Sequence, residues 1–402
     1  MYKTTRQTKL ETSPVVALDH NLRPFFPELI RFNSSRALHA SDVYKKLCSE
    51  IESVLTTVVQ ENMATEVKAA RSSIRATAWN IERGTHLKPI IKILRGHSSI
   101  GESDIYLLTE LDLGMARSHN RNVAQEIGRA LGLNYAFAPS YIALNKGSGL
   151  EDQVPGENRQ SLHGNALFSY HPLRDAQSIS LPNGKDLMKG KEKRLGSQCA
   201  VIATIDHPMG SFRAVSLHLD AQSSQKHRAR QMKIVIDHLN TLSPSLPILL
   251  GGDWNTATYN SSRAIYSILG YCRRVLMGVN YVIDNHYPYP DRWFERHLFR
   301  ELKRQGYHYE DLNEPGVCSL HYDVGDLAAN NRMGDWVPGW CFWFINWALQ
   351  KNNGRCSMKL DWFAGKDIAT DGIHPPRVFS DVHPDELSLS DHDPIVLDFI
   401  LS

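Results

Sequence analysis

The stretch Pro-Ile-Leu-Leu-Gly-Gly-Asp-Trp-Asn-Thr at residues 247–256 constrains the fold more than any other part of the sequence. Its apolar run, 248–250, is typical of a short buried strand. The two glycines that follow let the backbone turn at low steric cost. Asp253 and Asn255 come directly after this turn, where a rigid strand can aim polar groups at a ligand. The alternative to a ligand site is a strand that ends in an ordinary Asx turn. Whether other strands end in the same kind of polar residue distinguishes the two.

Several further segments alternate like strands and end close to a polar residue. The expected strands cover residues 74–80, 104–111, 134–139, 165–169, 199–205, 212–220, 359–363 and 395–401. Helical spacing of apolar residues predicts helices over residues 42–60, 89–95, 122–131 and 226–239. Residues 1–40 are expected to be irregular because three prolines interrupt them.

The polar residues at these strand ends form a set that a hydrophobic core does not explain. The set comprises Asn80, Glu110, His218, Asp253, Asn255, Asp361, Asp391 and His392. Buried ionisable groups are costly unless they are paired, hydrogen-bonded or bound to a metal. Carboxylate and amide oxygens suit Mg²⁺ or Mn²⁺ better than zinc. Histidine can act as an acid, a base or a hydrogen-bond donor to phosphate near neutral pH.

Composition excludes some classes of protein. The 402 residues include 45 Lys and Arg against 43 Asp and Glu. The chain therefore lacks the overall positive charge that is typical of many nucleic-acid-binding proteins. The six cysteines lack metal-site spacing and indicate a reduced, intracellular protein. The N-terminus has no apolar signal segment, and residues 339–349 fall short of the roughly 20 apolar residues that span a bilayer. We therefore expect a soluble, cytoplasmic protein.

Seven short motifs resemble those of the endonuclease/exonuclease/phosphatase superfamily, the DNase-I-like metal-dependent phosphoesterases. In the family order they are Trp79-Asn80-Ile81, Thr109-Glu110-Leu111, Gly164-Asn165-Ala166-Leu167, Ser216-Leu217-His218-Leu219, Gly252-Asp253-Trp254-Asn255, Leu360-Asp361-Trp362-Phe363 and Ser390-Asp391-His392-Asp393-Pro394. Each motif is weak alone, and the ordered set is specific. The resemblance implies an α+β fold, a four-layer α/β/β/α sandwich of two packed β-sheets flanked by helices. It places this domain at residues 71–402, after an N-terminal extension (1–70) with one amphipathic helix.

The resemblance also implies roles for individual residues. Glu110, Asn80 and Asp391 are expected to hold the metal, Mg²⁺ or Mn²⁺. Asp253 orients or deprotonates the attacking water, and His392, polarised by Asp361, contacts the scissile phosphate with His218 as a second histidine. Asn255 and Asn165 are expected to contact the substrate. Which group is the general base, and whether one or two metals bind, stays open.

These roles predict a metal-dependent hydrolase of phosphoesters, most simply of phosphodiesters, by in-line attack of water. The alternative is a catalytically silent relative that binds nucleic acid or phospholipid. The substrate class is open among nucleic acid, phospholipid and small phosphodiesters. An aromatic-rich insertion at about residues 258–357 departs from the family pattern. Its aromatics could form a local core, stack on bases or rest on lipid. Two interpretations of the basic stretches 183–194 and 226–233 are open: they are solvent-exposed, or they bind along the phosphate backbone of a nucleic acid.

Overall fold

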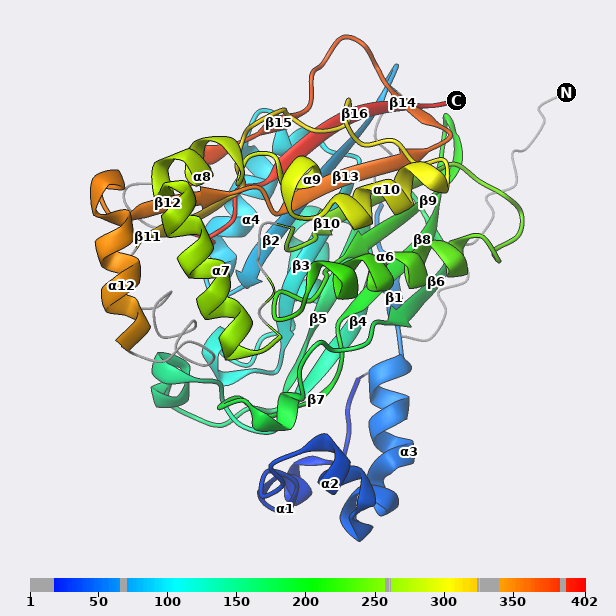
Figure 1. The fold of residues 1–402 in the computed structure, drawn as a ribbon. Helices are drawn as coiled ribbons and strands as arrows, with labels where there is room; N and C mark the ends of the chain where they lie inside the picture. The colour runs from blue at the N-terminus through cyan, green and yellow to red at the C-terminus, as the bar shows by residue number, and fades with distance from the viewer. Residues whose placement is uncertain are drawn as a thin grey trace, which may run out of the picture.

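The computed structural model describes residues 18–65, 71–256, 260, 262–323, 325, 340–383 and 388–402. Two β-sheets pack face to face in these residues, and helices cover their outer faces (Figure 1). The arrangement is a four-layer α/β/β/α sandwich, which confirms the expected fold class. Strand ends of the two sheets meet along one edge of the sandwich, where the Asn80 amide of the first sheet donates to Asp253 of the second at 3.1 Å.

The first sheet holds the strands that carry Asn80 and Glu110. Its strands run in the order β1, β4, β5, β3, β2, β16, β14, with β7 paired to β4 and β15 paired to β16. Their bounds are β1 Val59–Glu61, β2 Ile74–Arg83, β3 Ile105–Leu113, β4 Asn134–Ala143, β5 Leu162–Ser169, β7 Arg194–Gly196, β14 Ile368–Thr370, β15 Arg377–Val378 and β16 Ile395–Leu401. The pair β2–β3 is parallel, so the carboxyl ends of these two strands lie at the same edge.

The second sheet carries Asp253 and Asp361. Its strands run in the order β13, β10, β9, β8, β6. Their bounds are β6 Leu173–Ser180, β8 Cys199–His207, β9 Gly210–Leu217, β10 Ile248–Asp253 and β13 Asp361–Lys366. The strands β9 and β10 are parallel, whereas β10 and β13 are antiparallel. Asp253, at the end of β10, therefore lies opposite Asp361, at the start of β13.

Three apolar layers hold the sandwich together. The layer between the sheets contains Leu107 and Phe399 from the first sheet and Ala214 and Phe363 from the second. Outside the first sheet lie α3 (Asp42–Thr56), α4 (Leu87–Gly96) and α5 (Val123–Leu131), and outside the second lie α6 (Gln225–Leu239) and α10 (Arg296–Arg304). Burial of these apolar side chains is the main favourable contribution to the fold.

The N-terminal segment is more regular than expected. Two short helices, α1 (Phe26–Leu29) and α2 (Ser35–Ala40), precede α3, and Ser34 caps α2 with its side chain. The helix expected to reach residue 60 ends at Thr56 instead. Residues 59–61 form β1, which pairs with β4 at the edge of the first sheet. Pairing with a distant strand thus overrides the local helical spacing.

The basic stretch 183–194 partly turns inward. The Lys193 ammonium donates hydrogen bonds to the carbonyls of Ile30 and Phe32, at 2.7 and 2.8 Å. The Glu192 carboxylate is buried and pairs with Arg117 and Arg194. Lys193 therefore ties the N-terminal segment to the domain, and Glu192 is held inside the domain, so neither residue belongs to a freely solvated loop.

The described part of the insertion divides into two. Its α10 packs on α6 and completes the outer layer of the second sheet. The other elements are α7 (Ala264–Met277), α8 (Val279–Asn285), α9 (Pro290–Trp293), β11 (Leu320–Asp323), α12 (Trp340–Leu349) and β12 (Arg355–Met358). Around Val282, Tyr287 and Leu360 they build a small apolar cluster, the local core that was one of the three expectations for the aromatic residues.

Short 3₁₀ turns join several elements: Arg23–Phe25, Ile100–Glu102, Ala116–Ser118, Gly149–Gln153, Leu187–Lys189, Gln350–Asn352 and Ser380–Val382. The five described cysteines are unpaired thiols: Cys48, Cys199, Cys272, Cys318 and Cys356. Within the described ranges, each helix is either too short or too polar to cross a membrane.

Candidate active site

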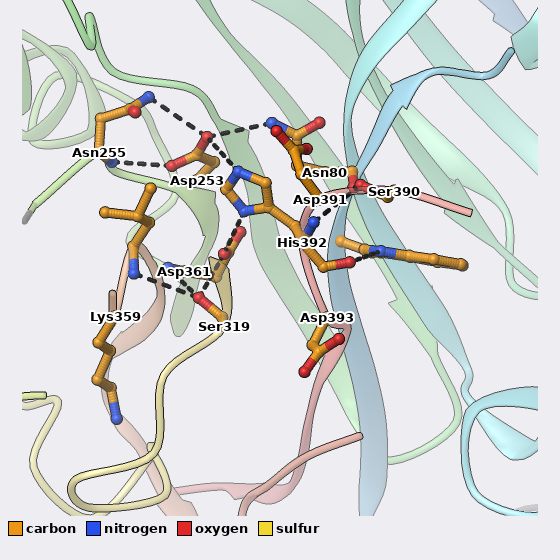
Figure 2. A network of polar contacts seen from close by, with 12 residues as sticks. Asn80, Asp253, Asn255, Ser319, Lys359, Asp361, Ser390, Asp391, His392 and Asp393 are labelled. Atoms are coloured by element: carbon orange, nitrogen blue, oxygen red, sulfur yellow. Dashed lines mark hydrogen bonds and ion pairs between the residues drawn. The ribbon is translucent and has the colours of Figure 1, made fainter. Parts of the chain in front are cut away.

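The Asp253 carboxylate is the centre of the site. One of its oxygens, Oδ2, accepts hydrogen bonds from the side-chain amides of Asn80 and Asn255, at 3.1 and 3.3 Å. The same oxygen lies 3.5 Å from Nε2 of His218 and 3.7 Å from Nε2 of His392. Figure 2 shows the contact with His392. Groups from four separate parts of the chain therefore converge on one buried carboxylate oxygen, as the sequence pattern predicted.

His392 and Asp361 form a buried pair beside Asp253. Nδ1 of His392 lies 2.7 Å from Oδ2 of Asp361, and the indole N–H of Trp79 donates to the His392 carbonyl at 2.8 Å. Burial opposes a charge on the imidazole, but the carboxylates of Asp361 and Asp253 raise the pKa of His392 well above its usual 6.5. These carboxylates favour the imidazolium form of His392, and its Nε2 faces Asp253.

Burial acts on Asp253 in the opposite sense. Removal from water raises the pKa of the Asp253 carboxyl, the charge of His392 lowers it, and the neighbouring Asp361 raises it. The net effect is a pKa above the ordinary value. A carboxylate of raised pKa is a better proton acceptor near neutral pH. The surroundings therefore favour Asp253 as a proton acceptor and His392 as a hydrogen-bond donor.

Glu110 occupies a strained position in β3. Its φ of 58° lies in the left-handed region, and the pairing of β3 with β5 shifts register between Leu108 and Leu111. Such a bulge turns a side chain away from the regular alternation of the strand. The Glu110 carboxylate then accepts a hydrogen bond from Asn80 Nδ2 at 3.2 Å. Strain of this kind persists only where surrounding contacts fix it, and it clusters at functional sites.

The charge of Glu110 is stabilised from several directions. Burial opposes its ionisation, but the positive charge of Arg83, followed by His218 and His163, outweighs this and lowers the Glu110 pKa to about 2. The amide of Asn165 supports the same bulge, because its Oδ1 accepts the Glu110 N–H at 3.3 Å and its Nδ2 donates to the Cys199 carbonyl at 2.9 Å. Asn165 therefore links the two sheets directly below Glu110.

Asp391 reaches the site through the loop before β16. The Ser390 hydroxyl donates to the Asn80 carbonyl at 2.6 Å, and the Asp391 N–H donates to Oε2 of Glu82 at 3.2 Å. Figure 2 shows the Asp391 side chain directed toward the region of Asn80. The three residues expected to hold a metal, Glu110, Asn80 and Asp391, are thus gathered at one side of Asp253.

Asn255 is a second site residue in the left-handed region, with φ of 52°. Its backbone N–H donates to Oδ1 of Asp253 at 2.9 Å, and its side-chain Nδ2 donates to the Leu219 carbonyl at 2.9 Å. The contact with substrate expected for Asn255 and Asn165 stays a prediction. In the observed bonds, Asn255 contacts Asp253 and Asn165 contacts the backbone of Glu110, so each asparagine positions an acid.

Two buried polar atoms at the site have no hydrogen-bond partner within the described ranges. They are Nδ1 of His218 and Oδ1 of Asp361. Unpartnered buried polar atoms are rare in folded proteins and are accepted at sites that bind another molecule. Asp253, Asp361 and His392 also form a buried group whose ligand-type atoms all lie within 4.8 Å of one another.

Sequence reasoning missed two groups that support the site. The Ser319 hydroxyl, from the insertion, donates to Oδ2 of Asp361 at 2.6 Å. Arg83, three residues after Asn80, supplies the largest stabilising charge on Glu110 and pairs with Glu151. The cation so close to Asn80 is a signal that could have been noted, whereas a serine inside a long insertion has no pattern that identifies it.

Comparisons with known proteins find similarity of structure only. No protein-family model matches the chain, and no curated protein matches it. An endonuclease/exonuclease/phosphatase structure from Beutenbergia cavernae matches 83% of this chain and 72% of its own at 15% identity, with a TM-score of 0.49.

Three such matches are described as endonuclease/exonuclease/phosphatase structures. This is the superfamily that the motifs resemble. The catalytic domain of human Nocturnin covers 86% of this chain and 98% of its own at 14% identity, with a TM-score of 0.45. A 3'-5' exonuclease from Neisseria meningitidis covers 81% and 100% at 14% identity and a TM-score of 0.45. Likenesses this distant carry nothing about activity, which must follow from the residues of this chain.

Proposed function

We propose that the protein is a divalent-metal-dependent hydrolase that cleaves phosphoester bonds, chiefly phosphodiesters, by in-line attack of water. The observation that carries the proposal is the convergence on Asp253 Oδ2, where two histidine Nε2 atoms lie at 3.5 and 3.7 Å and an asparagine amide lies at 3.1 Å. A phosphoester hydrolase needs a group that positions water and donors that stabilise the charge developing on phosphate.

The residues of the chain divide into these roles. Asp253, with its raised pKa, orients the water and accepts its proton. His392, kept protonated by Asp361, donates a hydrogen bond to the phosphate, and His218 faces the same space from the other side of Asp253. The protonated state of His392 argues against its use as the base and leaves that role to Asp253.

A metal fits beside these groups. Glu110 is held ionised because its pKa is lowered to about 2, and Asn80 lies beside it with Nδ2 toward the carboxylate. The Asn80 amide oxygen accepts the Glu82 N–H at 3.0 Å, so the amide would have to turn to offer this oxygen to a metal. With Asp391 they offer the hard oxygen donors that Mg²⁺ and Mn²⁺ prefer. Bound there, either ion would neutralise charge on the phosphate oxygens.

The test is a substrate panel assayed with Mg²⁺ and with EDTA. It compares plasmid DNA, RNA, sphingomyelin, inositol phosphates and bis-p-nitrophenyl phosphate. We expect Mg²⁺-dependent cleavage of at least one diester and loss of about 100-fold or more in Glu110→Ala and His392→Ala, the range expected for removal of such groups. His374→Ala is the matched control, because His374 is an exposed histidine paired with Asp371.

Two results would contradict the proposal. A near-native rate in the Glu110→Ala or His392→Ala variant would remove the assigned roles. Metal binding without cleavage of any substrate would favour the alternative, a binding module that has lost catalysis.

A further inference from the structure

A pocket lies between the N-terminal helices and the loop that joins β4 to β5. Its volume is about 330 Å³. One wall comes from residues 23–30, which include α1, and the other comes from residues 144–161. Figure 1 shows α1 and α2 beside the end of the sandwich that carries β7. Pockets of roughly 300 Å³ and more are large enough to hold a small organic ligand.

Lys193 ties the two walls together. Its backbone N–H donates to the side-chain oxygen of Asn145 at 3.1 Å, and its ammonium donates to the Ile30 carbonyl at 2.7 Å. On another side, the ring Nε2 of His20 donates to the Gln160 carbonyl at 2.6 Å. The positions of the walls are thus fixed by hydrogen bonds, so the pocket is a built feature of the folded chain.

Ser161 contributes a buried hydroxyl to the lining of this pocket. The residue is 0% exposed, and its Oγ has no hydrogen-bond partner among the described residues. Its backbone is held on both sides, because its N–H donates to the Gly114 carbonyl and its carbonyl accepts the Ala143 N–H. Its φ of 60° lies in the left-handed region, which is costly for a residue with a side chain. A buried hydroxyl without a partner is rare and calls for an explanation, which a bound ligand would provide.

The charged side chains of the lining are two cations and one acid: Arg23, Lys146 and Glu157. Arg23 and Glu157 are exposed, and Lys146 is half-buried. Among the described residues, no acid forms an ion pair with either cation. The Lys146 ammonium donates to the Val154 carbonyl at 3.0 Å and keeps further N–H groups for a ligand. Cations exceed acids in the lining, so the pocket favours an anion.

The rest of the lining includes an apolar surface made by Phe26, Pro27, Ile30 and Leu144. Phe26 and Ile30 are half-buried, so a ligand in the pocket would cover the part that still contacts water. An apolar surface with a few polar groups is the usual composition of a small-molecule site. An inorganic anion would leave this surface exposed, whereas an anion with an apolar group would use both parts of the pocket.

We propose that this pocket binds a small phosphate monoester that carries a ring or another apolar group. The phosphate would accept hydrogen bonds from Arg23, Lys146 and the Ser161 hydroxyl. The apolar group would lie on Phe26 and Ile30. A phosphate monoester carries about two negative charges at neutral pH, which matches a pair of cations better than a carboxylate does.

The class of ligand has a link to the chemistry of the active site. Hydrolysis of a phosphodiester by water releases a phosphate monoester and an alcohol, so a product of the proposed reaction belongs to the class that the pocket would bind. This link rests on the proposed function. The binding itself does not, since it follows from the lining of the pocket.

The experiment is isothermal titration calorimetry with the full chain in EDTA, so that no metal holds a phosphate at Asp253. The probes are phenyl phosphate, inorganic phosphate and benzyl alcohol. We expect phenyl phosphate to bind as one molecule per chain. Inorganic phosphate should bind about tenfold more weakly, because it buries no apolar area. Benzyl alcohol should show no measurable binding, because it lacks the charge.

Substitutions in the lining test the assigned contacts. Arg23→Gln should weaken binding of phenyl phosphate by about tenfold or more, since a charge-assisted hydrogen bond is lost. Ser161→Ala should weaken it by about fivefold, and Ser161→Gly should do the same, because glycine adopts a positive φ without strain and removes the same hydroxyl. Glu157→Gln should bind at least as tightly as the parent, because it removes the acid of the lining. Arg36→Gln is the matched control, since Arg36 is an exposed arginine of α2 outside the lining.

Three results would overturn the proposal: no binding of phenyl phosphate by the parent, equal affinities for phenyl phosphate and inorganic phosphate, or equal binding by the parent and Arg23→Gln. The Glu110→Ala variant distinguishes the pocket from the active site. Unchanged binding in this variant supports the pocket, whereas a loss there would place the probe at the active site and also overturn the proposal. Binding of phenyl phosphate by a protein that cleaves no phosphoester would contradict the proposed function and leave the pocket assignment standing.

Discussion

Asp253 and Asp361 are directly paired residues on the antiparallel strands β10 and β13, and His392 lies between their carboxylates. Nδ1 of His392 is 2.7 Å from Asp361, and its Nε2 is 3.7 Å from Asp253. One strand pairing therefore fixes both neighbours of the imidazole. Asp361 favours the charged form of the imidazole and fixes its orientation, and Asp253 faces Nε2.

Substitution Asp361→Asn tests this division. The amide keeps the shape of the carboxyl but removes the charge that raises the His392 pKa. We expect turnover on bis-p-nitrophenyl phosphate to fall by about 100-fold or more, with a smaller change in KM, because a protonated His392 stabilises the transition state. Asp393→Asn is the control, since Asp393 is equally buried but pairs with His321 and His383. Equal losses in both variants would show a general packing defect.

Ser319→Ala tests whether the insertion positions the catalytic pair. The hydroxyl donates to Asp361 and also accepts the Asp361 N–H at 3.1 Å, so its loss loosens that carboxylate. A hydrogen bond of this type is worth about 1 kcal/mol, which is roughly fivefold in rate. We expect kcat to fall by about this amount and Ser319→Thr to restore it. If threonine gave no recovery, the serine would have only a packing role.

The resemblance of the motifs predicted the fold, and the fold places the eight residues at one edge of the sandwich. Asn80, Glu110 and Asp253 lie toward the carboxyl ends of their strands, whereas Asp361 begins β13 and His392 precedes β16. The motifs could not predict the left-handed backbone of Glu110, since a bulge depends on how β3 pairs with its neighbours. For the same reason β1 was mistaken for the last turn of α3, because its pairing with β4 is a long-range contact. Ser319 lies in a sequence without periodicity, so only the folded chain shows that it contacts Asp361.

The buried acid Glu192 predicts a pH-dependent stability. Burial opposes its ionisation, but Arg194 and Arg117 outweigh this and lower the Glu192 pKa from 4.5 to about 2. A depressed carboxyl pKa stabilises the fold above the unfolded pKa of 4.5, and this contribution is lost as the pH falls through about 2. Glu192→Gln should therefore lower the free energy of unfolding by about 3 kcal/mol at pH 7, the energy that corresponds to lowering the pKa from 4.5 to about 2. Arg117 keeps Asp112 and Glu151 as partners in this variant.

Urea unfolding of Glu192→Gln and the parent at pH 7 and pH 3.5 measures this effect. The difference in free energy of unfolding between the two proteins should shrink at the lower pH. Glu157→Gln, an exposed acid, serves as the control and should show no such difference. A difference that stays constant with pH would mean that the Glu192 charge is not stabilised by its arginine partners.

Gly252→Ala tests the close approach of strands that places Asp253. Gly252 has φ of 134°, and a Cβ atom there would lie 2.3 Å from the Leu217 carbonyl oxygen. An alanine must push β10 away from β9, which displaces the adjacent Asp253. We expect a loss of more than about 1 kcal/mol in stability together with a fall in kcat, since the conformation is incompatible with a side chain. Gly132→Ala is matched in strain, with φ of 67°, but no atom lies within 4 Å of its added Cβ. It should lose stability without losing kcat, and if Gly252→Ala behaved the same way, the position of Asp253 would not depend on the contact between β9 and β10.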